Sequence, residues 1–300
     1  MQFGHLPPEE LDVIDFTLPT NSVFTNKTLA SAGKGHTPLV YVGCAKWGRK
    51  EWVGQIYPPK TKEANFLDHY VKHFNSIELN ATHYQVYPPS TISKWGEKAG
   101  TMDFKFCPKV PQAISHYTNL VTDKAQQLTD KFLEGIMAFQ EHLGPVFLQL
   151  SDKFSPKTKE NLYQYLKSLP TDIQVFAEVR HAEWYADKTI RKNLLETLQS
   201  NNTGLVITDT AGRRDCVHME LTIPKAFVRF VGNDLHPTDY ARIDAWMPRI
   251  NSWLESGLKE LYFFMHQPDE KYSPELCNYL VEQMNKHCKT ELVLPLKSEE

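Results

Sequence analysis

The segment SIELNATHYQVYPPS, residues 76–90, carries the first side chains whose types and spacing could do chemistry. Ile77 and Leu79 alternate with Glu78 and Asn80, which predicts a β-strand with one apolar and one polar face. A carboxylate and an amide on one face of a strand need a polar partner, because burying them unpaired costs free energy. The partner is water, another charge in the core, or a substrate.

Alternation also predicts the strands that position these groups. Short runs of β-branched and aromatic residues are expected to form eight strands, at 39–44, 76–81, 103–108, 146–150, 174–180, 204–209, 226–232 and 260–266. Helical periodicity lies between most of them, for example over 61–74, 124–144, 155–170, 237–257 and 273–288. Only the connection after residue 209 looks shorter than a full helix.

Strands that alternate with helices over about 260 residues predict an α/β fold of the (β/α)₈ TIM-barrel type, with a shortened or irregular sixth helix. The rival is an open doubly wound sheet, but the first turn, VGCAKWGRKEW, has no GxGxxG pattern. We expect residues 38–300 to form one barrel domain. The polar segment 1–37 is expected to be a loosely ordered N-terminal arm or clamp.

In a barrel the helix-facing side of each strand is apolar, so polar strand residues are assigned to the interior. This rule turns several polar side chains inward, at Glu78, Asn80, Lys105, Gln149, Glu178, Arg180 and Arg229. Asp209, His181 and His266 lie at or just beyond the carboxyl ends of their strands, where barrel enzymes gather their catalytic groups. Since Glu78, Glu178 and Asp209 balance three basic residues, a closed structural network of ion pairs is the alternative.

Each member of the cluster has a chemical role to offer. Arg180 and Arg229 can orient a carboxylate or phosphate. Glu78 and Glu178 are candidates for proton transfer, with Asp209 as a third catalytic carboxylate. Lys105 can stabilise an oxyanion or act as a nucleophile. The predicted substrate-binding residues are Trp47, Asn80, Tyr84, Gln149, Arg180, His181, Trp184, Arg229 and His266.

Composition narrows the function class. The net charge of −3 and the absence of a basic stripe argue against nucleic acid as a partner. Five dispersed cysteines without a CxxC pair, no signal peptide and no apolar span predict a cytoplasmic protein that does not bind a membrane. No nucleotide-binding motif appears, so the cofactor is unknown. A divalent metal among the carboxylates is disfavoured because three basic residues would crowd it and no HxH or HExxH spacing occurs.

Six segments together resemble the DUF72 family, a group of undetermined function. They are VGCAKWGRKEWVGQIYP, HFNSIELNATHY, FKFCPKVPQAISH with its Lys-x-Pro-x-x-Ile-x-His pattern, VFLQL, FAEVRHAEW and FVRFVG. The resemblance implies a TIM-type barrel and no known reaction. The residues taken to match its motifs are Trp47, Glu78, Asn80, Tyr84, Lys105, Gln149, Glu178, Arg180, His181, Trp184 and Arg229. The segment QLSDKFSPKT departs from the family pattern, and the 1–37 arm is extra.

Two functions follow as competing hypotheses. One is an enzyme of hydrolase, lyase or isomerase type that acts on a small polar or anionic metabolite carrying phosphate or carboxylate. The other is a non-catalytic barrel that binds a metabolite or docks on a protein. Processing of nucleic acid is the least favoured, on charge grounds.

Overall fold

The computed structural model describes residues 3–33 and 35–296 and has an α/β fold with parallel strands. The chain forms two compact units. Unit 1 comprises Met1–Ile77 and Ile207–Glu300, and unit 2 comprises Glu78–Val206. Unit 2 is therefore one continuous stretch, whereas unit 1 is made from both ends of the chain.

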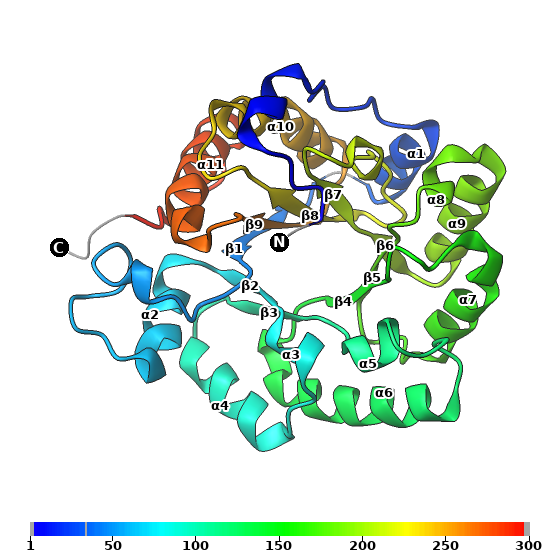
Figure 1. Ribbon diagram of the computed structural model, residues 1–300, viewed down its shortest axis with the longest axis horizontal. Coiled ribbons are helices and arrows are strands. Elements are labelled where there is room, and N and C mark those ends of the chain that lie inside the picture. Colours follow the sequence, from blue (N-terminus) through cyan, green and yellow to red (C-terminus); the bar gives the residue numbers. More distant parts are fainter. Residues whose placement is uncertain (1–2, 34, 297–300) are drawn as a thin grey trace. The chain divides into compact units, whose positions relative to one another are not determined.

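Unit 1 contains a four-stranded parallel sheet in the order β1-β9-β8-β7. The strands are β1 (Leu39–Cys44), β7 (Ile207–Asp209), β8 (Lys225–Val231) and β9 (Glu260–His266). The helices α10 (Pro237–Ser256) and α11 (Ser273–Cys288) lie side by side against this sheet (Figure 1). Trp246 of α10 packs edge-on against Trp253 and against Phe263 of β9, so one face of the helix is buried. The remaining helices of unit 1 are α1 (Val23–Ser31), α2 (Phe66–His73) and the 3₁₀ turns η1 (Pro8–Val13), η2 (Lys50–Trp52), η3 (Glu63–Asn65), η6 (Arg214–Cys216) and η7 (Glu270–Tyr272).

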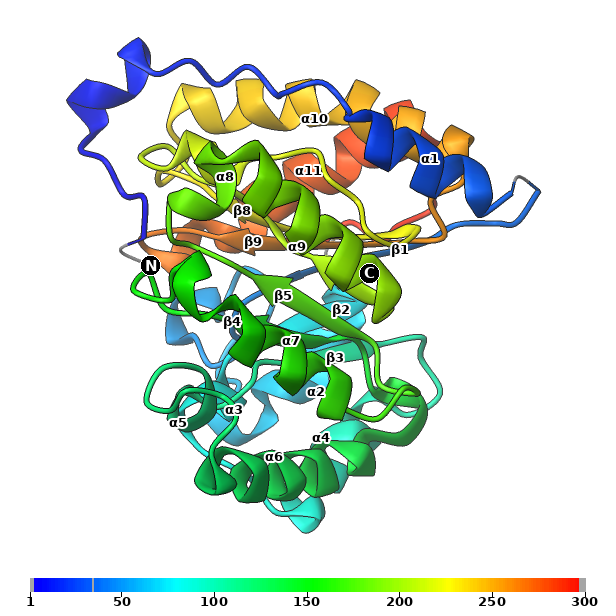
Figure 2. The same ribbon diagram turned by 90° about the vertical axis from the view of Figure 1, so that its right-hand side faces the viewer.

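Unit 2 contains the strands β3 (Lys105–Pro108), β4 (Val146–Gln149), β5 (Val175–Glu178) and β6 (Thr203–Leu205), while β2 (Ser76–Leu79) crosses the boundary between the units. β2 pairs with β3, and β4, β5 and β6 form a parallel sheet. Single bridges at Phe106↔Leu143 and Lys109↔Phe147 join the β3 region to the β4 region. The helices are α3 (Ala81–Tyr84), α4 (Pro89–Ala99), α5 (Gln112–Ser115), α6 (Asp123–Ile136), η4 (Met137–His142), η5 (Pro156–Thr158), α7 (Lys159–Ser168), α8 (Glu183–Ala186) and α9 (Lys188–Ser200). α4 and α6 pack together in both views (Figure 2).

Side chains form hydrogen bonds with the edge of β1 that does not pair with β9. The Asn75 amide accepts a hydrogen bond from the Val42 N–H at 2.7 Å and donates one to the Val40 carbonyl at 2.8 Å. The Tyr70 hydroxyl accepts from the Cys44 N–H at 2.8 Å and donates to the Ser76 carbonyl at 3.1 Å. The amide thus presents the same donor and acceptor pair that a neighbouring strand would present.

The N-terminal segment is more ordered than the sequence predicts. Residues 23–31 form α1, whose Thr25 is buried and donates to the Met219 carbonyl at 2.7 Å. The Asn21 side-chain oxygen accepts from Arg249 at 2.8 Å and from Trp253 at 2.9 Å, both on α10. The expectation of a loosely ordered arm is therefore wrong for this helix, because it is held by buried hydroxyl groups and by Leu29 rather than by a repeated apolar pattern.

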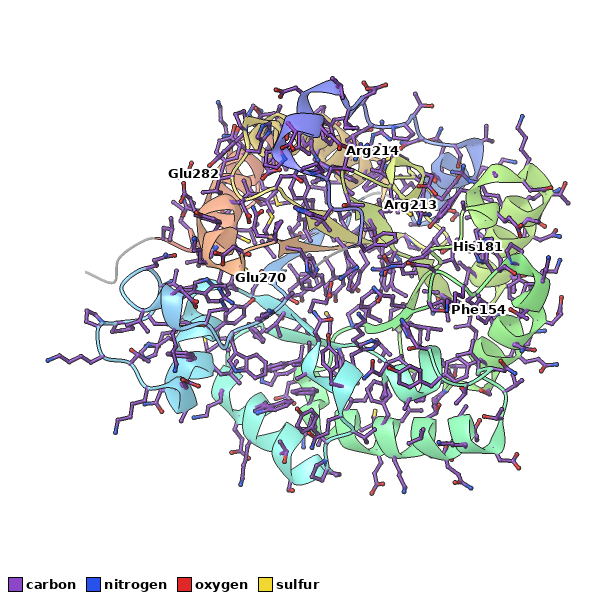
Figure 3. The ribbon with its side chains drawn as sticks, in the orientation of Figure 1. Phe154, His181, Arg213, Arg214, Glu270 and Glu282 are labelled. Atoms are coloured by element: carbon purple, nitrogen blue, oxygen red, sulfur yellow. The ribbon has the colours of Figure 1, made fainter. Side chains whose placement is uncertain are left out.

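The earlier part of the segment contacts the loop after β7. Arg214 lies over the ring of Phe16 at 5.1 Å and donates to the Phe16 carbonyl at 3.2 Å. Arg213 lies over the ring of Phe3 at 5.2 Å, and Figure 3 labels both arginines. The N–H of Gly212 donates to the Gly4 carbonyl at 2.8 Å. Gly4 has a φ of +67°, and a Cβ on it would collide with Thr210, so only glycine fits this crossing.

Most predicted strands are confirmed. β1 and β9 have the predicted bounds, β8 is shifted by one residue, and β2, β3, β4 and β5 are shorter than predicted. The predicted strand 204–209 is two strands, β6 and β7, one in each unit. The short sixth connection is confirmed, since residues 210–224, all described, contain η6 as their helical element. The ladders of the described residues group into three sheets, and no closed barrel is detected among them. No helix within 3–33 and 35–296 is long and apolar enough to cross a membrane.

Replacing Asn75 by alanine should remove both side-chain hydrogen bonds to the β1 backbone and leave the Val42 N–H and the Val40 carbonyl without these partners. We expect a loss of about 1–3 kcal/mol in the free energy of unfolding, measured by urea denaturation. Asn251→Ala is the matched control, because that side chain donates to Glu255 on the surface of α10. Equal losses in the two variants would contradict the role assigned to Asn75.

Candidate functional site

Four side chains at the carboxyl ends of three neighbouring strands form a continuous chain of hydrogen bonds in unit 2. The Lys109 Nζ donates to the Gln149 Oε1 at 2.9 Å, and the Gln149 Nε2 donates to the Glu178 Oε2 at 2.7 Å. The Arg180 Nε donates to the Glu178 Oε1 at 3.1 Å, and its Nη2 donates to Oε2 at 3.4 Å. All four residues are buried. We call Lys109, Gln149, Glu178 and Arg180 the β3–β5 cluster.

The strand register brings this cluster together. Gln149 and Glu178 are the last residues of β4 and β5 and lie opposite each other in the ladder. Lys109 follows directly after β3 and bridges to Phe147 of β4. Because parallel strands end at one edge, residues far apart in sequence meet there without a long loop.

The position of Gln149 requires a side chain that both accepts and donates a hydrogen bond. Its oxygen accepts from the ammonium of Lys109, while its nitrogen donates to the carboxylate of Glu178. A carboxylate could not donate to Glu178, and a basic side chain could not accept from Lys109. The two neighbours therefore fix which way the amide points.

Glu78 and Asn80, the pair in the opening motif, lie in unit 2 at the end of β2. The Asn80 Nδ2 donates to the Glu78 Oε1 at 2.9 Å, and the carboxylate is fully buried. Asn80 is not a strand residue, because its backbone is helical and precedes α3. The next turn is tied to β3, since the Thr82 hydroxyl lies 2.8 Å from the Lys109 carbonyl.

Two histidines close to Lys109 were missed by the sequence reasoning. His83 is buried on α3, and His116 follows α5, with ring centroids 5.1 Å apart in an edge-to-face arrangement. Burial lowers the pKa of His83 to about 4, and the Lys109 ammonium adds to that effect. Burial and Lys109 also lower the pKa of His116. Both imidazoles are therefore neutral at pH 7.

The lysine predicted from alternation is not in the cluster. Lys105 opens β3, and its Nζ donates to the carbonyl of Glu141, which lines a cavity of about 280 Å³ between α4 and η4. Lys109 lies four positions after Lys105, about 13 Å along an extended strand. The Lys-x-Pro-x-x-Ile-x-His pattern runs from Lys109 to His116, so the motif spacing already pointed to this lysine and this histidine.

The predicted aromatic and loop residues of unit 2 differ in exposure. Trp184 is fully buried, and its indole N–H donates to the Phe154 carbonyl at 2.9 Å, so its ring packs the loop after β4 onto α8. Tyr84 is 73% exposed beside His83. His181 is partly exposed after β5, and its Nδ1 accepts from the Glu183 N–H at 3.3 Å. Phe154 and His181 are labelled in Figure 3.

The remaining predicted residues, Asp209, Arg229, His266 and Trp47, belong to unit 1. Asp209 accepts from Arg242 at 2.9 Å and from the Trp246 indole at 2.8 Å, and it is also paired with Arg214. Burial alone would raise the pKa of Asp209, but Arg242 and Arg214 outweigh it and the net shift is downward. Asp209 is thus held as a carboxylate inside a structural network.

Arg229 and His266 form the second polar pair of unit 1, with Nη2 and Nε2 3.3 Å apart and both side chains buried. Trp47 is half-buried, and its carbonyl accepts from the Tyr57 hydroxyl at 2.7 Å. In the part of the chain that the structure describes, no group of three or more His, Cys, Asp or Glu residues is arranged to hold a metal ion.

The low pKa of His83 makes the protein less stable in acid. Above pH 6.5 His83 is neutral in both the native and the unfolded state, so it contributes nothing to the pH dependence. Between pH 6.5 and about 4 the unfolded chain binds a proton that native His83 does not, so the free energy of unfolding falls as the pH falls. We expect His83→Gln to flatten this part of the curve of Tm against pH. An unchanged slope would contradict the buried neutral imidazole.

The chain is similar in sequence to one protein family and to several of its relatives. The family described as "Protein of unknown function DUF72" matches residues 41–299. The UPF0759 protein YecE of Escherichia coli strain K12 is 29% identical over 266 residues, covering 83% of this chain and 93% of that protein. The UPF0759 protein YunF of Bacillus subtilis is 27% identical over 153 residues, covering 49% and 53%.

Solved structures of DUF72 family proteins have a similar fold. A DUF72 family protein from Enterococcus faecalis has a TM-score of 0.65 at 17% identity and covers 87% of this chain and 100% of its own. One from Thermotoga maritima has a TM-score of 0.61 at 21% identity and covers 83% and 99%. The family match spans the β3–β5 cluster and begins after the N-terminal segment. The chain is a member of the DUF72 family.

Proposed function

We propose that this protein is an enzyme that acts on a small metabolite carrying a carboxylate or phosphate, bound at the β3–β5 cluster. The observation that carries the proposal is the buried chain from Lys109 through Gln149 and Glu178 to Arg180. It fixes two cationic side chains at the carboxyl ends of parallel strands, the edge where α/β proteins bind their ligands.

The cluster offers the electrostatics that anion recognition needs. Arg180 has a planar fork of donors, which matches the paired oxygens of carboxylate and phosphate. Lys109 adds a second positive charge, and its position is set by Gln149 and by the ring of Phe147, whose centroid lies 5.4 Å from Nζ. Groups held in place before the ligand arrives stabilise charge without reorganising.

Glu178 has a different role in this proposal from the one that the sequence predicts. Both of its oxygens accept hydrogen bonds from Arg180 and Gln149, so we assign it to positioning these two side chains. Glu78, which accepts a hydrogen bond from the Asn80 Nδ2, is the carboxylate that we assign to proton transfer.

The engagement of Glu178 also favours a second candidate, a binder without catalytic activity. A carboxylate that accepts from two neighbours serves as a scaffold, and an anion held by Lys109 and Arg180 needs no further chemistry. Turnover separates the two candidates, since both predict that the anion binds at the cluster.

We further propose that the strands of the two units belong to one (β/α)₈ barrel. Parallel ladders in which consecutive strands β4, β5 and β6, and then β7 and β8, are neighbours support it. The single bridges between the β3 and β4 regions extend that sequential order. A crystal structure with continuous ladders around all strands is the direct test.

A cytoplasmic location completes the proposal. All five cysteines are buried and none forms a disulfide, which suits a reducing compartment. The net charge of −3 supports a small-molecule ligand rather than nucleic acid. Fractionation of cells that carry the tagged protein would test the location.

Lys109→Met should abolish the rise in Tm that phosphate or simple carboxylates cause in the wild-type protein, because the ligand loses one of its two cations. Lys105→Met is the matched control and should keep the full shift, since Lys105 binds the Glu141 carbonyl. Thermal shift titration with phosphate, acetate and citrate provides the measurement. A shift lost equally in both variants, or kept in both, would rule out binding at the cluster.

Turnover is measured in the same proteins. A mixture of phosphorylated and carboxylated metabolites is incubated with wild type and with Lys109→Met and followed by mass spectrometry. Consumption by the wild type alone is the result expected of an enzyme. A ligand-induced Tm shift without consumption favours the non-catalytic binder.

A further inference from the structure

The two neutral histidines beside Lys109 restrict what the ligand can be. The His83 Nδ1 lies 2.8 Å from the Val110 carbonyl, and a carbonyl can only accept, so Nδ1 carries the proton. The Nε2 of the neutral ring is then a hydrogen-bond acceptor. The tautomer of His83 is thus set by the backbone two residues after β3 and does not depend on any ligand.

For His116 the Nδ1 faces a side-chain hydroxyl, that of Ser115, instead of a backbone carbonyl. The Ser115 hydroxyl lies 3.2 Å from the Pro111 carbonyl, to which it donates its proton. With the proton assigned to this carbonyl, the oxygen accepts from the His116 Nδ1 at 2.8 Å, and we take the Nε2 of His116 as a second acceptor. Two imidazoles 5.1 Å apart, each with its Nδ1–H committed to the protein, form an acceptor pair.

The acceptor pair is attached to the same end of β3 as Lys109. His83 binds the carbonyl of Val110, the residue after Lys109, and Thr82 is tied to the Lys109 carbonyl at 2.8 Å. The site thus combines cationic donors, Lys109 and Arg180, with two neutral acceptors. Anionic oxygens satisfy the donors, but they repel the acceptor lone pairs, which require an O–H or N–H group from the ligand.

Building on the proposed anion site, we infer that its ligand is a hydroxylated acid: a carboxylate or phosphate that also bears hydroxyl groups, one of which donates to the Nε2 of His83. An anion without hydroxyl groups would offer no donor to the Nε2 of His83. Sites built to bind a hydroxyl discriminate strongly against the analogue that lacks it.

Matched ligands with and without hydroxyl groups test this inference. The pairs are gluconate against hexanoate and glycerol 3-phosphate against propyl phosphate, with Kd measured by isothermal titration calorimetry on the full chain. We expect the hydroxylated member of at least one pair to bind roughly 10-fold tighter or more. Equal affinity within both pairs overturns the inference and leaves the anion site standing. No binding by any of the four ligands overturns both.

Variants locate the preference at His83. His83→Phe keeps a flat ring but removes the acceptor, and we expect it to bind both members of a pair equally. His83→Gln, which supplies an amide oxygen as acceptor, should restore part of the preference and guards against a folding defect in the Phe variant. His287→Phe is the control, because His287 is exposed in the last turn of α11, outside the cluster. A preference that survives in both His83 variants overturns the inference.

Discussion

The hydrogen bonds of one amide, Gln149, organise the polar end of unit 2. Its two ends differ, so it can join the ammonium of Lys109 to the carboxylate of Glu178 in one orientation only. Buried charges cost several kcal/mol each unless they are paired and hydrogen-bonded. This amide links charged groups at the ends of three strands by hydrogen bonds. Arg180, which follows β5, pairs with Glu178. The arrangement keeps cations in a buried place where they would otherwise be expelled to water.

The buried charges around Asp209 in unit 1 are paired with one another in a closed network. Asp209 is surrounded by Arg242, Arg214 and the Trp246 indole, and Arg242 stacks at 4.1 Å over the ring of Phe230. Each charge there is matched by another protein group, which suits a brace between β7 and α10. The comparison separates two uses of buried charge within one chain: a network that holds elements together, and a cluster that holds cations and acceptors near a strand edge.

Sequence reasoning succeeded where a strand repeat applies and failed beyond the strand ends. Period-two alternation identified Gln149 and Glu178 because both are strand residues. It selected Lys105 instead of Lys109. Alternation shows which face of a strand a residue lies on but not how near it is to the end of the strand, and Lys109 follows the last residue of β3, Pro108. His83 and His116 lie on or after short helices of four residues, where no periodicity exists to read. Helix α1 escaped notice because it is anchored by buried threonines rather than by an apolar stripe.

The discontinuous course of unit 1 has a consequence for synthesis on the ribosome. Leu39 of β1 pairs with Glu260 of β9, about 220 residues later in the chain. At translation rates of about 5–20 residues per second, β1 waits roughly 10–40 seconds for this partner. Unit 2, which is continuous, emerges in full during that interval, and β4 and β5 are only 29 residues apart in the chain. The apolar strand LVYVGC thus stays without its β9 partner until most of the chain has been made, and slowing elongation would lengthen that exposure.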